Sequence, residues 1–172
     1  MKLSVKRLTA SAKLPTKAHE SDAGWDIYAD EDVEIRPGET MKVRTGIAAQ
    51  LDEGLDHGWD VPVNLIWDRS SLGCKGVHRL AGVIDYGFRN EYIVVLTNLN
   101  ILPVMEIMAM YAGSPECFER YKDALDIYSY KIKKGDKIAQ VLTQKVSKVT
   151  IVEAEDLTDA ERGLKGFGSS GS

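Results

Sequence analysis

The amino-acid sequence predicts an all-β domain arranged as a sandwich, a jelly roll or a barrel. Short segments of strand-forming residues recur through the first hundred residues, and turn residues such as Pro37-Gly38 separate them. Hydrophobic residues make up 44% of the 172 residues, which is enough apolar material for the core of one domain. Many short strands joined by turns are typical of these three architectures.

The predicted strands follow from the pattern of apolar residues along the chain. Residues 3–8 and 32–36 alternate between apolar and polar side chains, as half-buried strands do. Residues 92–96 form a continuous apolar run, which predicts a strand buried on both faces. The other predicted strands are residues 42–47, 61–67, 137–142 and 146–152.

Residues 101–130 interrupt this pattern and are predicted to be an insert in the β domain. Residues 101–112 are apolar and rich in methionine. A helix is predicted from Ser114 to Tyr130, with Ser114 as its cap and Pro115 at its first position. Amphipathic spacing supports this helix and places its apolar residues at Phe118, Tyr121, Leu125 and Tyr128.

Charge and cysteine content restrict the functional classes. The net charge of −4 argues against a nucleic-acid polymer as partner, although it permits a nucleotide substrate. Cys74 and Cys117 lack metal-ligand spacing and are interpreted as two reduced thiols, with a disulfide as the alternative. No apolar run is long enough to span a membrane and the N-terminus lacks a signal-peptide pattern, so we expect a cytoplasmic protein.

Two polar segments predict a phosphate site. In residues 68–73, Arg69 offers a planar donor fork for phosphate oxygens, and Ser70 and Ser71 add hydroxyl groups. In residues 134–140, a Gly-Asp turn leads into a strand that carries Gln140. Each segment alone also fits an ordinary solvent-exposed turn.

Two further segments supply carboxylates. Residues 82–89 read as a hairpin that places Asp85 beside the ring of Phe88, and an ionised Asp can act as a general base. Asp26 lies among the strand-forming residues 23–29. Both aspartates taken singly also fit surface or turn positions.

The last dozen residues, 161–172, are rich in Gly and Ser and predict a mobile tail. Arg162 adds a cation, Phe167 offers a face for stacking a base, and Gly168 permits close approach to phosphate. Ser169 and Ser170 add hydroxyl groups.

In their order along the chain, these five segments resemble the five motifs of the trimeric dUTPase family. The resemblance extends from about Ala23 to Ser172 and leaves out the insert, as in some phage-type members. It implies a jelly-roll-like β-barrel, one domain over residues 1–172, and a homotrimer with shared active sites in a bacterial or phage-infected cell. It also implies hydrolysis of dUTP to dUMP and pyrophosphate with Mg²⁺, which the substrate phosphates mainly hold.

The resemblance implies a role for each matching residue. Asp85 would activate the water that attacks the α-phosphorus, and Asp26 would support the catalytic arrangement and, indirectly, the metal site. Phe88 would pack on the deoxyribose, and Phe167 would stack on uracil as the tail closes as a lid. Contacts with the phosphates would come from Arg69, Ser70, Ser71, Gln140, Arg162, Gly168, Ser169 and Ser170.

The chain also departs from the family pattern. Asp68 stands where Pro is usual, and a carboxylate beside a phosphate site is unfavourable unless it points away or helps the metal. Phe88 replaces the usual Tyr, Asn90 a usual Gly, and Ser71 another usual Gly. One alternative is dCTP deaminase, which needs a Glu near Val95, where this chain is apolar. The other is a nucleotide-responsive regulator that binds a protein partner through the insert.

Overall fold

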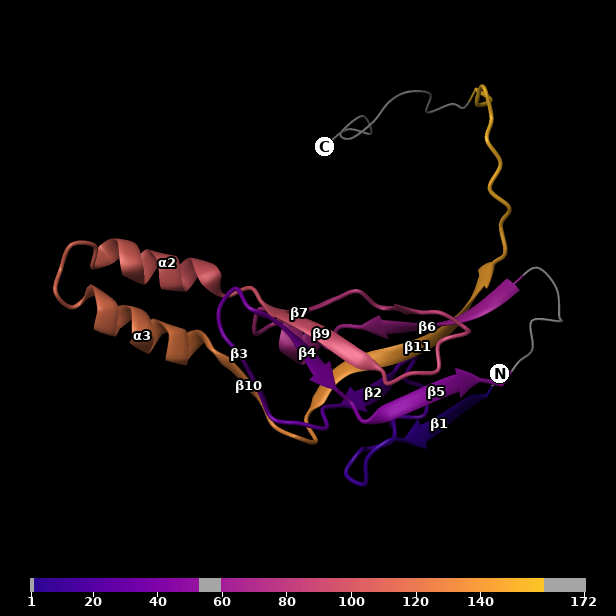
Figure 1. Cartoon of the computed structure of the whole chain (residues 1–172), viewed down its shortest axis with the longest axis horizontal. Coiled ribbons are helices and arrows are strands. Elements are labelled where there is room, and N and C mark those ends of the chain that lie inside the picture. The colour runs from indigo at the N-terminus through magenta and orange to yellow at the C-terminus, as the bar shows by residue number, and fades with distance from the viewer. Residues whose placement is uncertain (1, 53–59, 160–172) are drawn as a thin grey trace.

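In the computed structural model, which describes residues 2–52 and 60–159, antiparallel strands form a β body and two helices project from it (Figure 1). The expected all-β, jelly-roll-like fold with a helical insert is confirmed. A four-stranded sheet has the order β2 (Trp25–Tyr28), β11 (Lys137–Ser147), β6 (Asp60–Trp67) and β8 (Val83–Ile84). A three-stranded sheet has the order β4 (Thr40–Arg44), β9 (Ile93–Asn98) and β7 (Val77–Leu80).

Two strand pairs complete the described part of the body. They are β1 (Leu3–Arg7) with β5 (Ile47–Leu51), and β3 (Val33–Ile35) with β10 (Tyr130–Ile132). Both pairs are antiparallel. They therefore extend the body without parallel crossovers.

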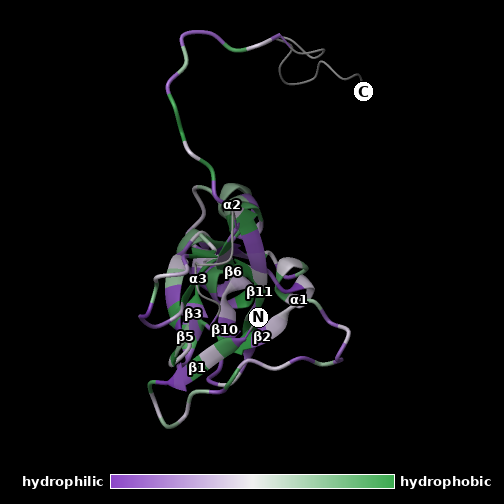
Figure 2. Ribbon diagram, turned by 90° about the vertical axis from the view of Figure 1, so that its right-hand side faces the viewer, coloured by the Kyte–Doolittle hydropathy of each residue, from purple (hydrophilic) through white to green (hydrophobic). Residues whose placement is uncertain are grey.

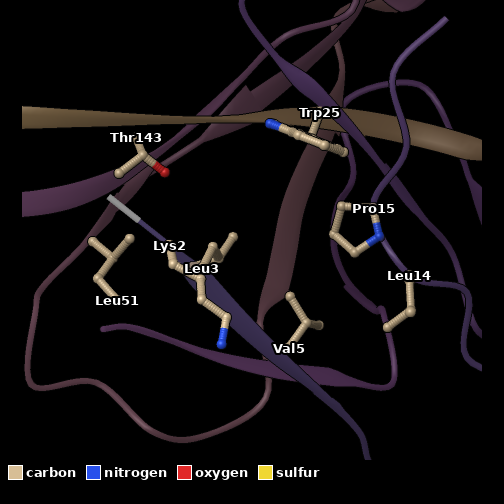
Figure 3. A pocket seen from close by; sticks show the side chains of 8 residues that line it. All are labelled: Lys2, Leu3, Val5, Leu14, Pro15, Trp25, Leu51 and Thr143. Atoms are coloured by element: carbon tan, nitrogen blue, oxygen red, sulfur yellow. The ribbon is translucent and has the colours of Figure 1, made fainter. Parts of the chain in front are cut away.

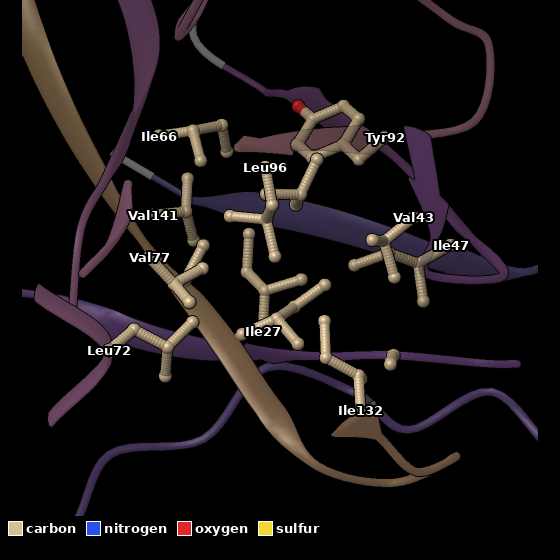
Figure 4. Packing of buried hydrophobic residues seen from close by; sticks show 14 of the residues in the cluster. Ile27, Val43, Ile47, Ile66, Leu72, Val77, Tyr92, Leu96, Ile132 and Val141 are labelled. Carbon is tan, nitrogen blue, oxygen red and sulfur yellow. The ribbon is translucent and has the colours of Figure 1, made fainter. Parts of the chain in front are cut away.

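One apolar cluster joins these sheets (Figure 4). Ile27 of the four-stranded sheet and Val43 and Leu96 of the three-stranded sheet are at most 1% exposed. Fully burying a side chain of this size contributes about 1.5–3 kcal/mol. The cluster therefore fixes the sheets, and with them the polar residues at their edges.

Three strand predictions need correction. The strand expected at residues 42–47 is two strands, because the chain turns at Gly46, whose φ is +66°. β9 is not buried on both faces, since Ile93 is 43% exposed. β11 continues to Ser147 and replaces the separate strand expected at 146–152. Residues 148–159 then run extended, away from the body (Figure 2).

The insert is a helical hairpin of α2 (Ile101–Met110) and α3 (Cys117–Tyr128). The predicted helix is confirmed as the shorter α3, but Glu116 occupies the N-cap position in place of Ser114. The predicted apolar stripe is wrong at Phe118, which is 63% exposed, whereas Ala124 is buried. The hairpin is anchored to the body by Asn98, whose Nδ2 donates to the carbonyl of Tyr128 at 2.8 Å.

Cys74 and Cys117 are both free thiols, so the alternative disulfide is not formed. Among the described residues, no helix has the length and apolar character needed to cross a membrane. The predicted lid at residues 161–172 lies outside the described residues.

Candidate active site

A first cavity, of about 360 Å³, lies beside β2, β11 and the segment that precedes β2, and we call it the phosphate pocket. Asp26, Arg69, Lys137 and Gln140 are among the residues that line it. Strand register explains this gathering, because Gln140 on β11 lies opposite Asp26 on one side and Trp67 on the other. Arg69 follows β6 by two residues and therefore reaches the same place.

Asp26 holds the two cations of the pocket. Its Oδ1 lies 3.0 Å from Arg69 Nε, and its Oδ2 lies 2.7 Å from Lys137 Nζ. The hydrogen bond to Asp26 raises the pKa of the Lys137 ammonium, so this group remains protonated near neutral pH. Because Asp26 is only 8% exposed, both pairs compensate the burial of its charge. Asp22 also lines the pocket, so its formal charges balance, and Arg69 and Lys137 are the cationic donors that it offers to an anionic ligand.

Arg69 is further fixed by two bonds from its Nη1. One goes to Ser71 Oγ at 3.3 Å and the other to the Lys137 carbonyl at 3.2 Å. Ser70 and Ser71 begin the single-turn helix α1 (Ser70–Gly73), and both are exposed. The second predicted segment therefore forms a fixed turn with accessible hydroxyl groups.

Gly24 allows Gln140 to lie in the pocket. A Cβ atom on Gly24 would stand 2.5 Å from Gln140 Oε1. Any other residue at position 24 would therefore push the Gln140 amide away. This explains why a glycine belongs in the first predicted segment.

A second cavity, of about 290 Å³, lies under the segment that follows β7, and we call it the base cavity. Asp85 and Phe88 line it, and the Asp85 carbonyl accepts the Phe88 N–H at 3.0 Å. The Phe88 ring lies 6.2 Å from that of the buried Tyr92, measured between centroids. The segment therefore brings Asp85 and Phe88 to one cavity through a turn closed by a backbone hydrogen bond.

The buried Tyr92, whose ring lies near that of Phe88, connects this segment to the core. Burial raises the pKa of its hydroxyl, so the group stays protonated and accepts a hydrogen bond from Asn64 Nδ2 at 2.8 Å. Asn64 in turn accepts from Thr143 at 2.7 Å. A buried polar chain thus connects the base cavity to β11, the strand of the phosphate pocket.

The structure gathers some predicted site residues and separates others. Asp26, Arg69 and Gln140 share the phosphate pocket, whereas Asp85 and Phe88 line the base cavity. Outside the described residues lie Arg162, Phe167, Gly168, Ser169 and Ser170. Sequence reasoning missed Lys137 and Tyr92. Lys137 lies within the predicted segment 134–140, but a regular strand would place it and Gln140 on opposite faces, and the register shift between Lys137 and Ala139 was not predictable from the sequence.

A divalent metal held by the protein would need several oxygen or nitrogen ligands brought together. Within residues 2–52 and 60–159, no three His, Cys, Asp or Glu side chains gather to hold one. Both oxygens of Asp26 are already paired with cations.

The fold and the two cavities define a β-barrel protein with a polar pocket whose Arg69 and Lys137 suit a phosphorylated ligand. A family model described as dUTPase matches residues 10–105 and 126–171. The chain belongs to the dUTPase family. The unmatched residues 106–125 fall within the helical hairpin, in agreement with the predicted phage-type insert.

Individual relatives support the same family. A deoxyuridine 5'-triphosphate nucleotidohydrolase of Nocardia farcinica is 35% identical, covering 97% of this chain and 84% of the relative. The enzyme of that name from Mycobacterium bovis is 34% identical, covering 98% and 94%. A solved Staphylococcus bacteriophage 80alpha dUTPase with dUPNHPP superposes with a TM-score of 0.75, at 25% identity and over 99% of both chains.

Proposed function

We propose that this chain performs the reaction of its family, the hydrolysis of dUTP to dUMP and pyrophosphate. The observation that carries the proposal is the phosphate pocket, in which Asp26 holds Arg69 and Lys137 beside Gln140. Such a preorganised set of donors can bind a triphosphate without rearranging. Membership of the dUTPase family indicates that the bound nucleotide is dUTP.

Asp85 is proposed as the general base. It is exposed in the base cavity, and an ordinary aspartate is ionised at neutral pH. Its carboxylate would take a proton from a water that attacks the α-phosphorus, and pyrophosphate would leave. Phe88 would pack on the deoxyribose, and the backbone of the segment from Leu80 to Ile93 would read uracil.

The phosphates would contact Arg69, Gln140 and the hydroxyls of Ser70 and Ser71. Arg162, Gly168, Ser169 and Ser170 would close over them, with Phe167 stacked on uracil. Mg²⁺ would be held by phosphate oxygens and water, and Asp26 would reach it only indirectly. Bound there, the ion would neutralise phosphate charge and fix the phosphate geometry.

A homotrimer with shared sites belongs to the same proposal, and one domain would span residues 1–172. The extended residues 148–159 support assembly, since Val149 and Ile151 are 77% and 93% exposed. An apolar cavity of about 420 Å³ beside β1 could accept such side chains (Figure 3). Ending the chain at Ser147 should reduce the mass measured by light scattering, whereas ending it before Arg162 should keep the trimer and abolish turnover.

The dCTP deaminase alternative lacks its general base. Val95 and its neighbours in β9 carry no carboxylate. The closest carboxylate in sequence, Glu91, is paired with Arg44 at 3.1 Å and accepts the Gly46 N–H at 2.8 Å. Both contacts fix Glu91 in a structural role.

A regulatory role could coexist with hydrolysis. Among the hairpin residues, Leu102, Met110 and Ile127 are 66–76% exposed, as expected of a surface that binds a protein partner. Deleting residues 104–129 should abolish such binding and leave hydrolysis intact. Unchanged partner binding would remove support for this role.

Product analysis with Mg²⁺ tests the proposal directly. With dUTP, dCTP, dTTP and UTP offered separately, we expect dUMP and pyrophosphate from dUTP alone. Deamination of dCTP, or binding of dUTP without cleavage, would contradict it.

A further inference from the structure

Asp68 lies where the family usually has proline, directly before Arg69. Its carboxylate points toward β7 and is not part of the phosphate pocket lining. Oδ1 accepts the backbone N–H of Arg79 at 2.7 Å, and Oδ2 lies 3.0 Å from His78 Nδ1. The Arg79 side chain approaches the same oxygen, with Nε at 3.8 Å. We call these three residues the Asp68 clamp.

The clamp joins the walls of the two cavities. On one side, Asp68 is bonded through the backbone to Arg69, which lines the phosphate pocket. On the other side, β7 leads through Leu80 and Ala81 into the lining of the base cavity. If the segment that follows β7 moved relative to Arg69, the distance between the sites for the base and the phosphates of a bound nucleotide would therefore change.

Arg79 extends the clamp into the base cavity wall. Its guanidinium lies 5.1 Å from the ring centroid of Trp67, and its Nη1 donates to the Ala81 carbonyl at 3.2 Å. Ala81 has a φ of +58°, a left-handed conformation that is strained for a residue with a side chain. The neighbouring Gly82 carbonyl accepts the N–H of Ile66 at 2.7 Å. Arg79 thus helps to hold a strained backbone at the entrance to the cavity.

We propose that Asp68, acting through His78 and Arg79, is a positioning residue that sets the base cavity against the phosphate pocket. It thereby contributes to the affinity for the nucleotide and to the selection of uracil over thymine. This role rests on the proposed function. A proline at this position would offer no acceptor for the Arg79 N–H or for the two basic side chains.

The expected effect is on geometry more than on fold stability. The side chains of the clamp are partly exposed, at 29% for Asp68, 49% for His78 and 21% for Arg79, so solvent screens their electrostatic contacts. Small misplacements of binding groups nevertheless reduce binding and catalysis strongly. Asp68→Asn keeps an acceptor for the Arg79 N–H, whereas Asp68→Ala removes it.

The test measures the dissociation constant of dUPNHPP by calorimetry, together with kcat and KM for dUTP and dTTP. For Asp68→Ala we expect affinity to fall on the order of ten-fold, with KM affected more than kcat, and dUTP-over-dTTP selectivity to fall. Asp68→Asn should recover most of both. Asp123→Ala, at an exposed carboxylate on α3, is the control and should resemble wild type.

Each outcome decides a separate question. Wild-type affinity and selectivity in Asp68→Ala would overturn the positioning role. If wild type binds dUPNHPP but hydrolyses nothing, the proposed function fails, while the affinities of the variants still test the clamp. If Asp68→Ala melts below the assay temperature, His78→Gln carries the test: we expect its affinity and selectivity to fall, and wild-type values of both would contradict the proposal.

Discussion

The phosphate pocket and the base cavity are built in opposite ways. In the phosphate pocket, the buried Asp26 is already paired with Arg69 and Lys137, so the charges are arranged before any ligand arrives. In the base cavity, Asp85 is exposed and its carboxylate has no partner within residues 2–52 and 60–159, while the Phe88 ring is 41% exposed. In the phosphate pocket the charged side chains are thus paired within the described chain. In the base cavity Asp85 and Phe88 remain accessible to a ligand.

The largest expected effect is at Asp85. Asp85→Asn should lower kcat by about 10²- to 10⁴-fold, because the general base is lost, while the dissociation constant of dUPNHPP stays near wild type. Single-turnover kinetics and calorimetry check the two parts. Retained turnover would mean that another group is the general base, and the proposed catalytic role of the base cavity would then be wrong.

The next effect is at Lys137. Lys137→Met removes one of two cations from the preassembled wall, and we expect KM for dUTP to rise on the order of ten-fold. Lys137→Arg keeps the charge and should stay close to wild type. A KM that is unchanged in Lys137→Met would show that Arg69 alone supplies the positive charge.

A smaller effect is expected at Gly24. Gly24→Ala places a Cβ against Gln140 and should raise KM several-fold with little change in kcat. The reason is that it displaces Gln140, a proposed phosphate contact, and leaves the proposed general base Asp85 in place. Gly73→Ala is a matched control, because a Cβ there meets nothing within 4 Å. Equal kinetics of the two variants would contradict the role of Gln140.

The smallest effect is at Asp30, outside both cavities. Burial raises its pKa, but hydrogen bonds from Thr9, Ser11 and Lys134 outweigh this and hold the pKa below its ordinary value. The resulting stability is full above the ordinary pKa, about 3.9, and is lost as pH falls through the lowered one. Asp30→Asn should lower the free energy of unfolding by about 1 kcal/mol at pH 7, and denaturant titrations should show the difference shrinking in acid.

Sequence patterns predicted the β class because alternation and turn residues are local signals. They could not predict that β11 pairs with β2, since this pairing joins residues more than a hundred positions apart and depends on the whole core. The gathering of Asp26 with Gln140 was accordingly expected from family resemblance, and Lys137 was missed. The orientation of Asp68 was also not predictable, because His78 and Arg79 come beside it only when the chain turns back through α1, which packs against β7.

The methionines of this chain have an uneven distribution that bears on oxidation. Met105, Met108 and Met110 on α2 are 41–76% exposed, whereas the buried core cluster contains no methionine, and neither do the described linings of the two cavities. Peroxide converts exposed methionine to the polar sulfoxide. Mild oxidation should therefore change the surface of the helical hairpin from apolar to polar. Met41 on β4 is also 38% exposed and Cys74 is an exposed thiol, so replacing these two residues would confine the oxidation to the hairpin and to Cys117.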